Sequence, residues 1–227
     1  MDLGFHKKEV AIPFGNIRLK GELIIPPRTN AIIIFSHGSG SSRLSIRNQQ
    51  VAKYLEGKHF GTLLFDLLTE AEDRHNYNRF DIDLLATRLS GVTGWLESHP
   101  AAKNCRIGFF GASTGAASAL KVASALPQIA AVVSRGGRPD LAMKYLHMVK
   151  APTLLIVGGL DSDVLKLNKV AYEKLNCEKK LEVVPGATHL FEETGKMEIV
   201  SELAGNWFEK YLNPINSFRE GVTPPVP

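Results

Sequence analysis

Three side chains that lie far apart in the sequence have the types and the order needed for nucleophilic acyl transfer. Ser113 is the centre of a Gly-x-Ser-x-Gly pattern, Asp161 follows a pair of glycines, and His189 comes later still. A serine hydroxyl becomes a strong nucleophile when an imidazole removes its proton, and a carboxylate holds that imidazole in the correct tautomer. We therefore predict Ser113 as the nucleophile, His189 as the general base and Asp161 as the residue that orients the histidine.

Each of these residues also has an ordinary explanation. A serine or aspartate between a strand and a helix often caps the helix, and a single loop histidine is often a solvated bystander. Asp163 competes with Asp161, although it opens a predicted helix and suits that helix's first turn. Of the seven histidines, only His189 follows the acid, and the chain order serine, acid, histidine favours the catalytic interpretation.

Acyl transfer also needs backbone donors for the developing oxyanion. One donor is the N–H that follows the nucleophile, and the other comes from a loop after an early strand, so we predict Thr114 and Ser39. Ser39 lies in the Gly- and Ser-rich segment 37–42, which is otherwise a flexible loop. A phosphate-binding loop is disfavoured because no lysine follows at the required spacing. His37 is expected to shape this loop.

Short apolar runs predict the strands that position these residues. From residue 31 onwards, such runs alternate with longer amphipathic stretches, as in parallel strands that are buried on both faces and joined by helices. The runs are AIIIFS, GTLLFD, RIGFFG, IAAVVS, TLLIVGG and LEVVPG. Before them, EVAIPF and IRLKGELII flank Gly15-Asn16, which predicts an antiparallel hairpin.

Helices are predicted at about 44–57, 81–98, 114–126, 139–147, 163–175 and 193–211. Ligands of such sheets collect at the carboxyl ends of the strands, and the predicted catalytic residues follow strand ends. The pattern therefore predicts an α/β protein with about eight strands and helices on both faces. We expect one domain over 1–212 and an extended tail over 213–227, which is rich in proline.

The motifs HG, GASTG, GGLD and GATHLF, in that order, resemble the α/β-hydrolase superfamily and its dienelactone-hydrolase-like branch. The resemblance covers about residues 8–212 and implies the α/β-hydrolase fold. The segment 136–150 is too short for a separate cap domain, so we expect no large cap. Dienelactone hydrolases carry a cysteine nucleophile where this chain has Ser113, so their particular substrate is not transferred. The resemblance implies a serine hydrolase of small carboxylic esters that forms an acyl-enzyme. Thioesters and lactones use the same parts, and a non-catalytic binding or regulatory protein is the alternative.

Four arginines are candidates for contact with the substrate. Arg135 and Arg138 follow a strand end, while Arg43 and Arg47 follow the predicted oxyanion loop at helical spacing. A guanidinium binds carboxylates through two parallel hydrogen bonds, so Arg43, Arg135 and Arg138 predict a substrate with an anionic group. The equally weighted alternative is that these arginines pair with nearby acids, which are Asp66, Glu70, Asp81 and Asp140.

Composition restricts the remaining possibilities. The net charge of +4 is scattered along the chain, so nucleic-acid binding is not expected. Apolar runs are too short for a membrane span, and two cysteines without a partner pattern favour a reducing, cytoplasmic location. The acidic segment 66–73 is expected to be a solvated loop, so we predict no metal and no cofactor. The expected partner is a small-molecule ester, and a homodimer is left open.

Overall fold

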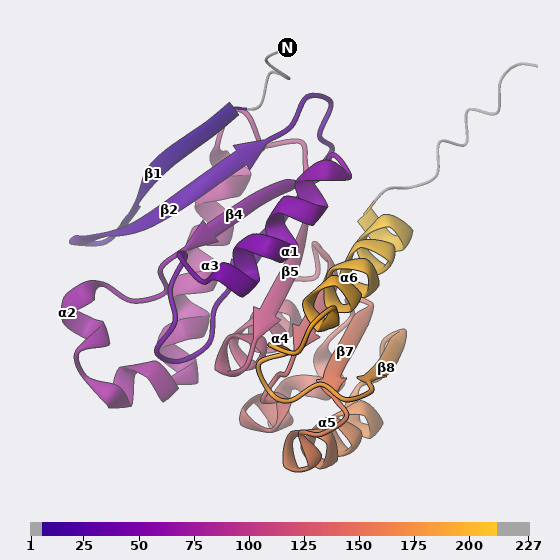
Figure 1. The fold of residues 1–227 in the computed structure, drawn as a ribbon. Helices are drawn as coiled ribbons and strands as arrows, with labels where there is room; N and C mark the ends of the chain where they lie inside the picture. The colour runs from indigo at the N-terminus through magenta and orange to yellow at the C-terminus, as the bar shows by residue number, and fades with distance from the viewer. Residues whose placement is uncertain (1–5, 213–227) are drawn as a thin grey trace, which may run out of the picture.

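An eight-stranded sheet forms the centre of the computed structural model, which describes residues 6–212 (Figure 1). Its strand order is β1-β2-β4-β3-β5-β6-β7-β8. The strands are β1 (His6–Phe14), β2 (Ile17–Ile25), β3 (Ala31–Ser36), β4 (Gly61–Phe65), β5 (Arg106–Ala112), β6 (Ile129–Arg135), β7 (Thr153–Gly158) and β8 (Lys179–Val184). Strand β2 pairs antiparallel with β1 and β4, and the later pairs are parallel. The predicted sheet and its antiparallel N-terminal hairpin are confirmed.

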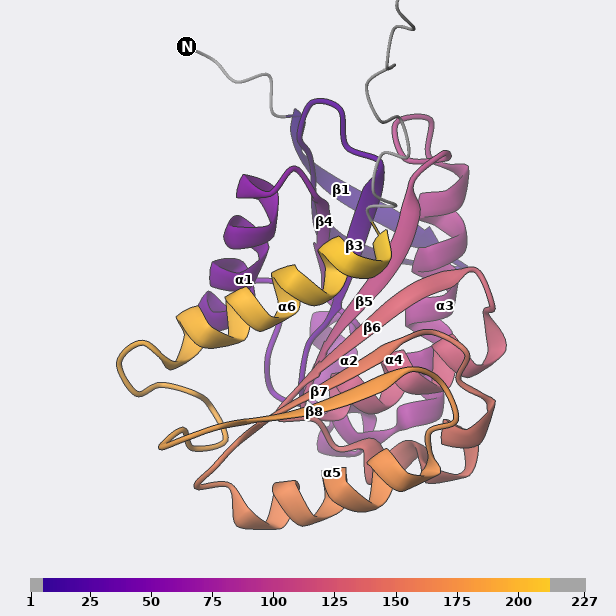
Figure 2. The ribbon, with the colours of Figure 1, turned by 90° about the vertical axis from the view of Figure 1, so that its right-hand side faces the viewer.

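Helices cover both faces of this sheet. They are α1 (Ile46–Gly57), α2 (Glu70–Asp73), α3 (Ile82–Ser98), α4 (Thr114–Ala125), α5 (Ser162–Lys174) and α6 (Lys196–Leu212). Helices α1 and α6 lie on one face, and α3, α4 and α5 lie on the other (Figure 2). The helix predicted at 139–147 is a 3-10 segment, Pro139–Met148, with a kink at Ala142.

The N-terminal hairpin turns within two residues. Phe14 pairs with Ile17, which leaves Gly15 and Asn16 as the loop, and Gly15 has a φ of 55°. A positive φ at the first central position suits a type II′ turn, whose twist matches that of the flanking strands. Glycine supplies this conformation without the steric clash of a Cβ atom, so the turn that the sequence predicts forms where expected.

Strand β3 separates two apolar cores. All six of its residues are buried. Successive side chains point to opposite faces, so Ile32 and Ile34 join the core under α3, α4 and α5, while Ile33 and Phe35 join the core under α1 and α6. This burial on both faces is why the strand is a continuous apolar run. The two cores hold the carboxyl ends of the central strands in fixed positions.

The acidic segment after β4 is a capped helical turn, so the expectation of a solvated loop is wrong. Glu72 accepts a hydrogen bond from the Thr69 N–H and donates its own N–H to the Thr69 hydroxyl, which forms a capping box at α2. Arg88 and Arg79 form ion pairs with Glu72 and Asp73. The Thr-x-x-Glu spacing is a recognisable signal for such a box. These ion pairs neutralise the negative charges of Glu72 and Asp73, whose partners could not be identified from the sequence alone.

The structure also bears on the cysteines, on a membrane span and on a metal site. Cys105 and Cys177 are free, and burial raises the pKa of both thiols. Within residues 6–212, no helix has the length and apolar character needed to span a bilayer. In the same range, no three His, Cys, Asp or Glu side chains gather into a group suited to a metal ion. The predicted tail, 213–227, lies outside the described residues.

Helix α4 approaches strand β3 so closely that only glycine fits at its second residue. A Cβ atom on Gly115 would lie 2.1 Å from the Ser36 carbonyl oxygen and 2.4 Å from the His37 carbonyl oxygen. Gly111 has a similar constraint, because its Cβ would lie 2.5 Å from the Ala116 Cα. Both clashes involve backbone, which cannot move aside without shifting the strand or the helix. The two glycines of the Gly-x-Ser-x-Gly pattern are therefore required by packing.

We expect Gly115→Ala to lower the free energy of unfolding by about 3 kcal/mol, because the added methyl group overpacks a rigid junction. Urea denaturation measures this change. Gly94→Ala is the matched control, since Gly94 lies exposed in α3 with no atom within 4 Å of an added Cβ. Alanine there should stabilise the helix by up to about 1 kcal/mol. Equal stability of Gly115→Ala and the wild type would contradict the packing argument.

Candidate active site

Ser113 occupies a strained turn between β5 and α4. Its φ of 51° and ψ of −122° belong to a region that non-glycine residues rarely adopt. It stands at the N-cap position of α4, yet its side chain makes no capping hydrogen bond. Capping, the ordinary explanation for this serine, therefore does not apply. A strained residue of this kind costs about 1–3 kcal/mol and is typical of functional turns.

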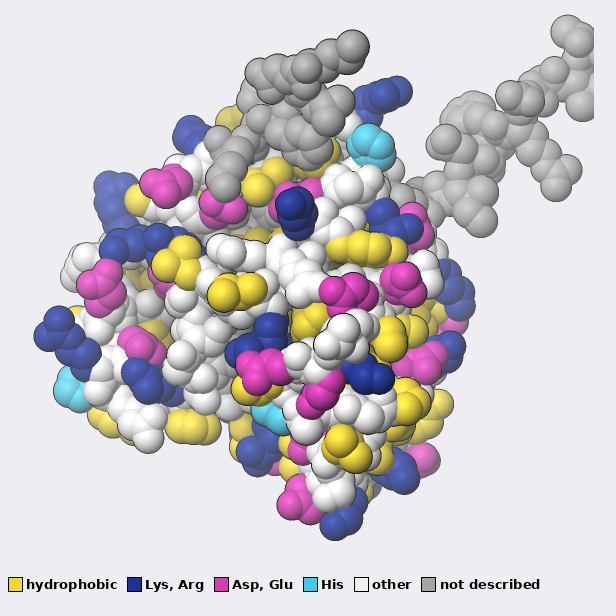
Figure 3. Space-filling model, viewed as in Figure 1, with side chains coloured by type: hydrophobic (Ala, Val, Ile, Leu, Met, Phe, Trp, Pro, Cys, Tyr) yellow, Lys and Arg dark blue, Asp and Glu magenta, His cyan; other side chains and the backbone are white. Residues whose placement is uncertain are grey.

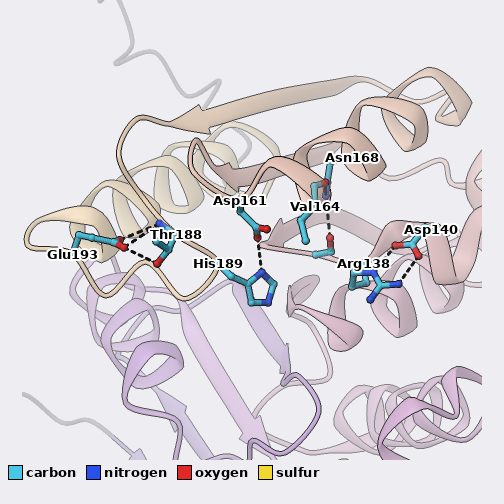
Figure 4. A network of polar contacts seen from close by, with 9 residues as sticks. Arg138, Asp140, Asp161, Val164, Asn168, Thr188, His189 and Glu193 are labelled. Carbon is cyan, nitrogen blue, oxygen red and sulfur yellow. Dashed lines mark hydrogen bonds and ion pairs between the residues drawn. The ribbon is translucent and has the colours of Figure 1, made fainter.

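Asp161 and His189 are joined directly by a hydrogen bond. His189 Nδ1 lies 2.6 Å from Asp161 Oδ2, as Figure 4 shows. Asp161 is at the N-cap position of α5 but, like Ser113, makes no side-chain cap bond. A carboxylate that accepts the Nδ1 proton leaves Nε2 of a neutral imidazole with its lone pair, as a general base requires. Asp163, the alternative acid, is exposed and pairs with Lys166.

The loop that carries His189 is fixed at both sides of the ring. Glu193 accepts hydrogen bonds from the backbone N–H and the hydroxyl of Thr188, the latter at 2.6 Å (Figure 4). These bonds from Thr188 hold the pKa of Glu193 below its usual range. On the other side, Gly136 lies so close that a Cβ added there would be 3.5 Å from His189 Cε1. The hydrogen bonds between Thr188 and Glu193 thus fix the loop that carries His189, and the Gly136 backbone lies beside the imidazole ring.

Ser113 and His189 line the same cavity of about 250 Å³. Its other lining residues are Gly38, Ser39, Ser41, Ser45, Arg47, Asn48, Ala112, Arg135 and Leu190. No hydrogen bond joins Ser113 Oγ to His189 Nε2 within residues 6–212; in unliganded enzymes this contact often tightens only when substrate binds. A larger cavity of about 560 Å³ between α1, β2 and β4 contains none of the predicted site residues.

Ser39 and Thr114, the predicted oxyanion donors, flank the nucleophile from two segments. Ser39 lines the cavity, and Thr114 is the first residue of α4 and is buried. Gly38, the residue before Ser39, lies close to the nucleophile: a Cβ atom added to Gly38 would be 3.0 Å from the Ser113 Cβ. Across the part of the chain that the structure describes, neither backbone N–H has a protein acceptor. Ser39 thus has a free N–H in a residue that lines the cavity, and the oxyanion role of Ser39 and Thr114 stays a prediction.

His37 ties the Ser39 loop to the end of strand β4. Its Nε2 accepts a hydrogen bond of 3.0 Å from the Leu67 N–H, so Nδ1 carries the proton and donates it to the Gly38 carbonyl oxygen, also at 3.0 Å. Burial lowers the pKa of His37, which favours this neutral form. His37 thus shapes the loop, as the sequence predicts, and is not among the residues that line the cavity.

The arginines divide into two groups. Arg43 donates its backbone N–H and its guanidinium to Asp66, and Arg138 pairs with Asp140 through two hydrogen bonds (Figure 4). Neither lines the cavity, and both pair with acids, as the alternative in the sequence analysis has it, so their contact with a substrate stays a prediction. Arg135 lines the cavity and has no acidic partner within the described residues.

Sequence reasoning did not select two further residues that line the cavity. Arg47, considered only as part of a cationic rim, and Asn48 lie in the first turn of α1, which Ser45 caps. Asn48 is 3% exposed, and its side-chain oxygen has no partner among the described residues. A serine followed by a helical pattern signals the N-cap, but only the tertiary structure shows that this helix end faces the nucleophile.

The architecture and the cavity together define an α/β-hydrolase. A family model described as the dienelactone hydrolase family matches residues 66–217. This chain belongs to that family, which confirms the resemblance inferred from its motifs.

Comparison with solved structures and curated proteins agrees with the assignment. A dienelactone hydrolase from Anabaena variabilis is 49% identical, with a TM-score of 0.89 over 92% of this chain and 99% of that one. An esterase from Pyrococcus furiosus shares the fold at 20% identity, with a TM-score of 0.76 and 93% of each chain covered. A Mycobacterium tuberculosis protein provisionally named a phosphoribosyl transferase is 54% identical over 90% of this chain. The match spans 46% of that relative, so this chain has about half the length of the curated relatives that it matches.

The strain at Ser113 predicts different stabilities for two substitutions that both remove the hydroxyl. Ser113→Gly should be more stable than Ser113→Ala by about 1 kcal/mol, because glycine has no Cβ to oppose a positive φ, and this relief outweighs its greater freedom in the unfolded state. Chemical denaturation of the two variants measures the difference. An alanine variant as stable as the glycine variant, or more stable, would show that the turn stores no strain.

The tether through His37 predicts a pH-dependent stability. His37→Leu should cost about 1–3 kcal/mol at pH 8, since it leaves the buried Leu67 N–H without an acceptor. Because burial lowers the folded-state pKa of His37, the unfolded chain takes up the proton first as the pH falls below about 6.5. The advantage of the wild type should therefore shrink between pH 8 and pH 5. Urea unfolding at both pH values tests this, and an unchanged gap would refute it.

Proposed function

We propose that this chain is a serine hydrolase that cleaves carboxylic esters through an acyl-enzyme on Ser113. The observation that carries the proposal is that two side chains at helix N-cap positions do not cap their helices. Ser113 and Asp161 both stand at N-cap positions without capping, and Asp161 instead binds the imidazole of His189. His189 and Ser113 then face one cavity. A structural role explains neither the strain nor this pairing.

In the first half of the reaction, Ser113 Oγ attacks the carbonyl carbon of the ester while His189 Nε2 takes the hydroxyl proton. Asp161 stabilises the imidazolium and keeps Nε2 directed at the nucleophile. The tetrahedral oxyanion accepts hydrogen bonds from the backbone N–H groups of Ser39 and Thr114. When the intermediate collapses, the bond from carbon to the leaving oxygen breaks, and His189 returns its proton to the departing alcohol.

In the second half, water takes the place of the alcohol. His189 removes a proton from the water, the hydroxide adds to the acyl carbon, and the bond to Ser113 Oγ breaks as the acid leaves. The serine hydroxyl is regenerated by the proton held on His189. This sequence needs no electron transfer, and every proton passes through a single imidazole.

Thioesters and lactones are further substrates of the same chemistry, since both present a carbonyl carbon with a leaving group. The name of the Anabaena variabilis relative, dienelactone hydrolase, supports lactones as a class to test. The phosphoribosyl transferase name belongs to relatives about twice as long as this chain, and it offers no role for Ser113, Asp161 and His189. We therefore propose acyl hydrolysis for this part of those proteins' sequence as well.

A fluorophosphonate probe should label the wild-type protein at Ser113, and Ser113→Ala should abolish the labelling. For an aryl acetate substrate, Ser113→Ala, His189→Gln and Asp161→Asn should each lower kcat by about 10³-fold or more, because the three residues act as a unit. Circular dichroism verifies that each variant is folded. A wild type that neither labels nor turns over short aryl esters, thioesters and lactones would identify a non-catalytic binding or regulatory protein.

A further inference from the structure

Strand β8 forms one edge of the sheet, and the backbone groups on its outer side are unused. The Thr153 N–H of β7 donates a hydrogen bond of 2.8 Å to the Glu178 carbonyl oxygen, so Glu178 and every second residue after it face β7. The backbone groups of Lys179, Leu181 and Val183 therefore face outward. Within residues 6–212, these outward N–H and C=O groups have no hydrogen-bond partner.

The edge is open and lacks the usual structural blocks. In Figure 2, β8 lies between α6 above it and α5 below it, and both helices flank the strand. Val183 is 40% exposed. Proteins commonly protect such an edge with proline or a bulge, because an open strand is a template for pairing with another strand. Strand β1, at the opposite edge, contains Pro13, whereas β8 has no proline and keeps an unbroken register with β7.

The charged side chains of β8 do not block the edge either. A lysine on an edge strand ordinarily discourages a second strand. Lys179, however, turns back to the C-terminus of α5, where its Nζ donates to the Tyr172 and Leu175 carbonyl oxygens at 2.6 and 2.8 Å. Lys180 and Glu182 form an ion pair of 2.6 Å along the strand. The strand thus presents one positive and one negative side chain on the same face, two residues apart.

This pair of opposite charges determines which partner fits. On the face of the molecule seen in Figure 3, Lys and Arg side chains are interspersed with Asp and Glu, so recognition there depends on the match of single charges. A strand with a positive and a negative residue two positions apart is complementary to an antiparallel copy of itself, because reversal of direction exchanges the two positions. The second copy of this chain is therefore the partner that the charges of β8 select.

The charges also select one register. In an antiparallel pair, outward-facing residues oppose outward-facing residues, so a two-fold axis lies at a residue and not between two residues. An axis at Lys180 or at Glu182 would place that charge opposite its own copy, which is destabilising. An axis at Leu181 places Lys180 opposite Glu182 of the second copy, and by symmetry the reverse. Directly opposed charges of unlike sign stabilise a pair of strands.

We propose that this protein forms a homodimer in which the two β8 strands pair antiparallel about Leu181 and join the two sheets into one. The homodimer that the sequence leaves open is thereby given a specific surface. Leu181 exchanges backbone hydrogen bonds with its own copy, and Lys179 does so with Val183 of the second copy. The aliphatic part of the Lys179 side chain covers the exposed Val183. The contact is two-fold and closed, so it ends at the dimer.

Charge reversal tests the pairing by sedimentation equilibrium of the full chain. The wild type should be a dimer, and Lys180→Glu should raise the dimer Kd by about tenfold or more, because it opposes like charges at two symmetric positions. Glu182→Lys should have the same effect, and the double variant Lys180→Glu with Glu182→Lys should restore the wild-type Kd. Lys20→Glu is the matched control: it breaks the exposed pair of Lys20 and Glu70 on β2 and should leave the Kd unchanged.

Disulfide formation tests the register. Cys105 and Cys177 are first replaced by serine, so that no native thiol reacts. Residues that oppose each other without hydrogen bonds in an antiparallel pair have Cα atoms about 4.5 Å apart, a separation that a disulfide can bridge. An equimolar mixture of Lys180→Cys and Glu182→Cys chains should therefore form a covalent dimer under mild oxidation. Either variant alone should form little, because it has no cysteine opposite its own.

The two experiments leave the proposal open to refutation without reference to catalysis. A wild type that remains a monomer over the concentration range in which it is soluble would overturn it. A dimer whose Kd does not respond to Lys180→Glu, or a mixture that fails to cross-link more than the single variants, would reject pairing through β8. Circular dichroism verifies that each variant is folded. None of these measurements uses turnover, so failure of the hydrolase proposal would not affect them.

Discussion

The close contact between helix α4 and strand β3 is the constraint on which the rest of the site depends. Gly115 has no room for a side chain against the Ser36 and His37 carbonyl oxygens, so the helix must begin within a residue of the strand end. The chain has only Ser113 in which to reverse direction, and its φ of 51° is the result. Packing at the glycines thus generates strain at the serine. The same junction places Ser113 at the N-terminus of α4, where the helix dipole gives a partial positive charge.

The parts of this protein that the sequence predicts well depend on local patterns. The run AIIIFS is apolar throughout because β3 is buried on both faces, and the Gly15-Asn16 pair forms the turn that its types favour. The order of Ser113, Asp161 and His189 follows from strand order, so their meeting at one sheet edge could be anticipated. In each case the signal and the structure it specifies lie within a few residues of each other or follow from topology.

Ion pairs between distant segments could not be predicted in this way. Arg43 meets Asp66 only because β3 and β4 are adjacent in the sheet, and the sequence offered several acids as partners. An arginine that lines the cavity and one that pairs with an acid have the same local sequence signals, and only the tertiary structure separates them. The capped turn at α2 is a different case. The spacing of Thr69 and Glu72 signals a capping box in the sequence, but the prediction of a loop followed the acidic composition of the segment. Sequence patterns therefore locate charged residues better than they assign their partners.

The site residues share a feature besides their chemical types: each lacks a stabilising interaction that its position in the fold would favour. Ser113 and Asp161 stand where they would stabilise helices by capping and do not, and Arg135 is buried where an acid would stabilise it and has none among residues 6–212. Each missing interaction lowers the stability of the unliganded protein, and a single substitution at that position could recover the loss. Natural proteins retain such losses mainly where function requires them, because mutations that remove the loss are otherwise neutral or favourable. Ser113 and Arg135 line one cavity, and Asp161 binds His189, which lines it too, so the proposed hydrolase role explains these features with fewer assumptions than three separate accidents of packing.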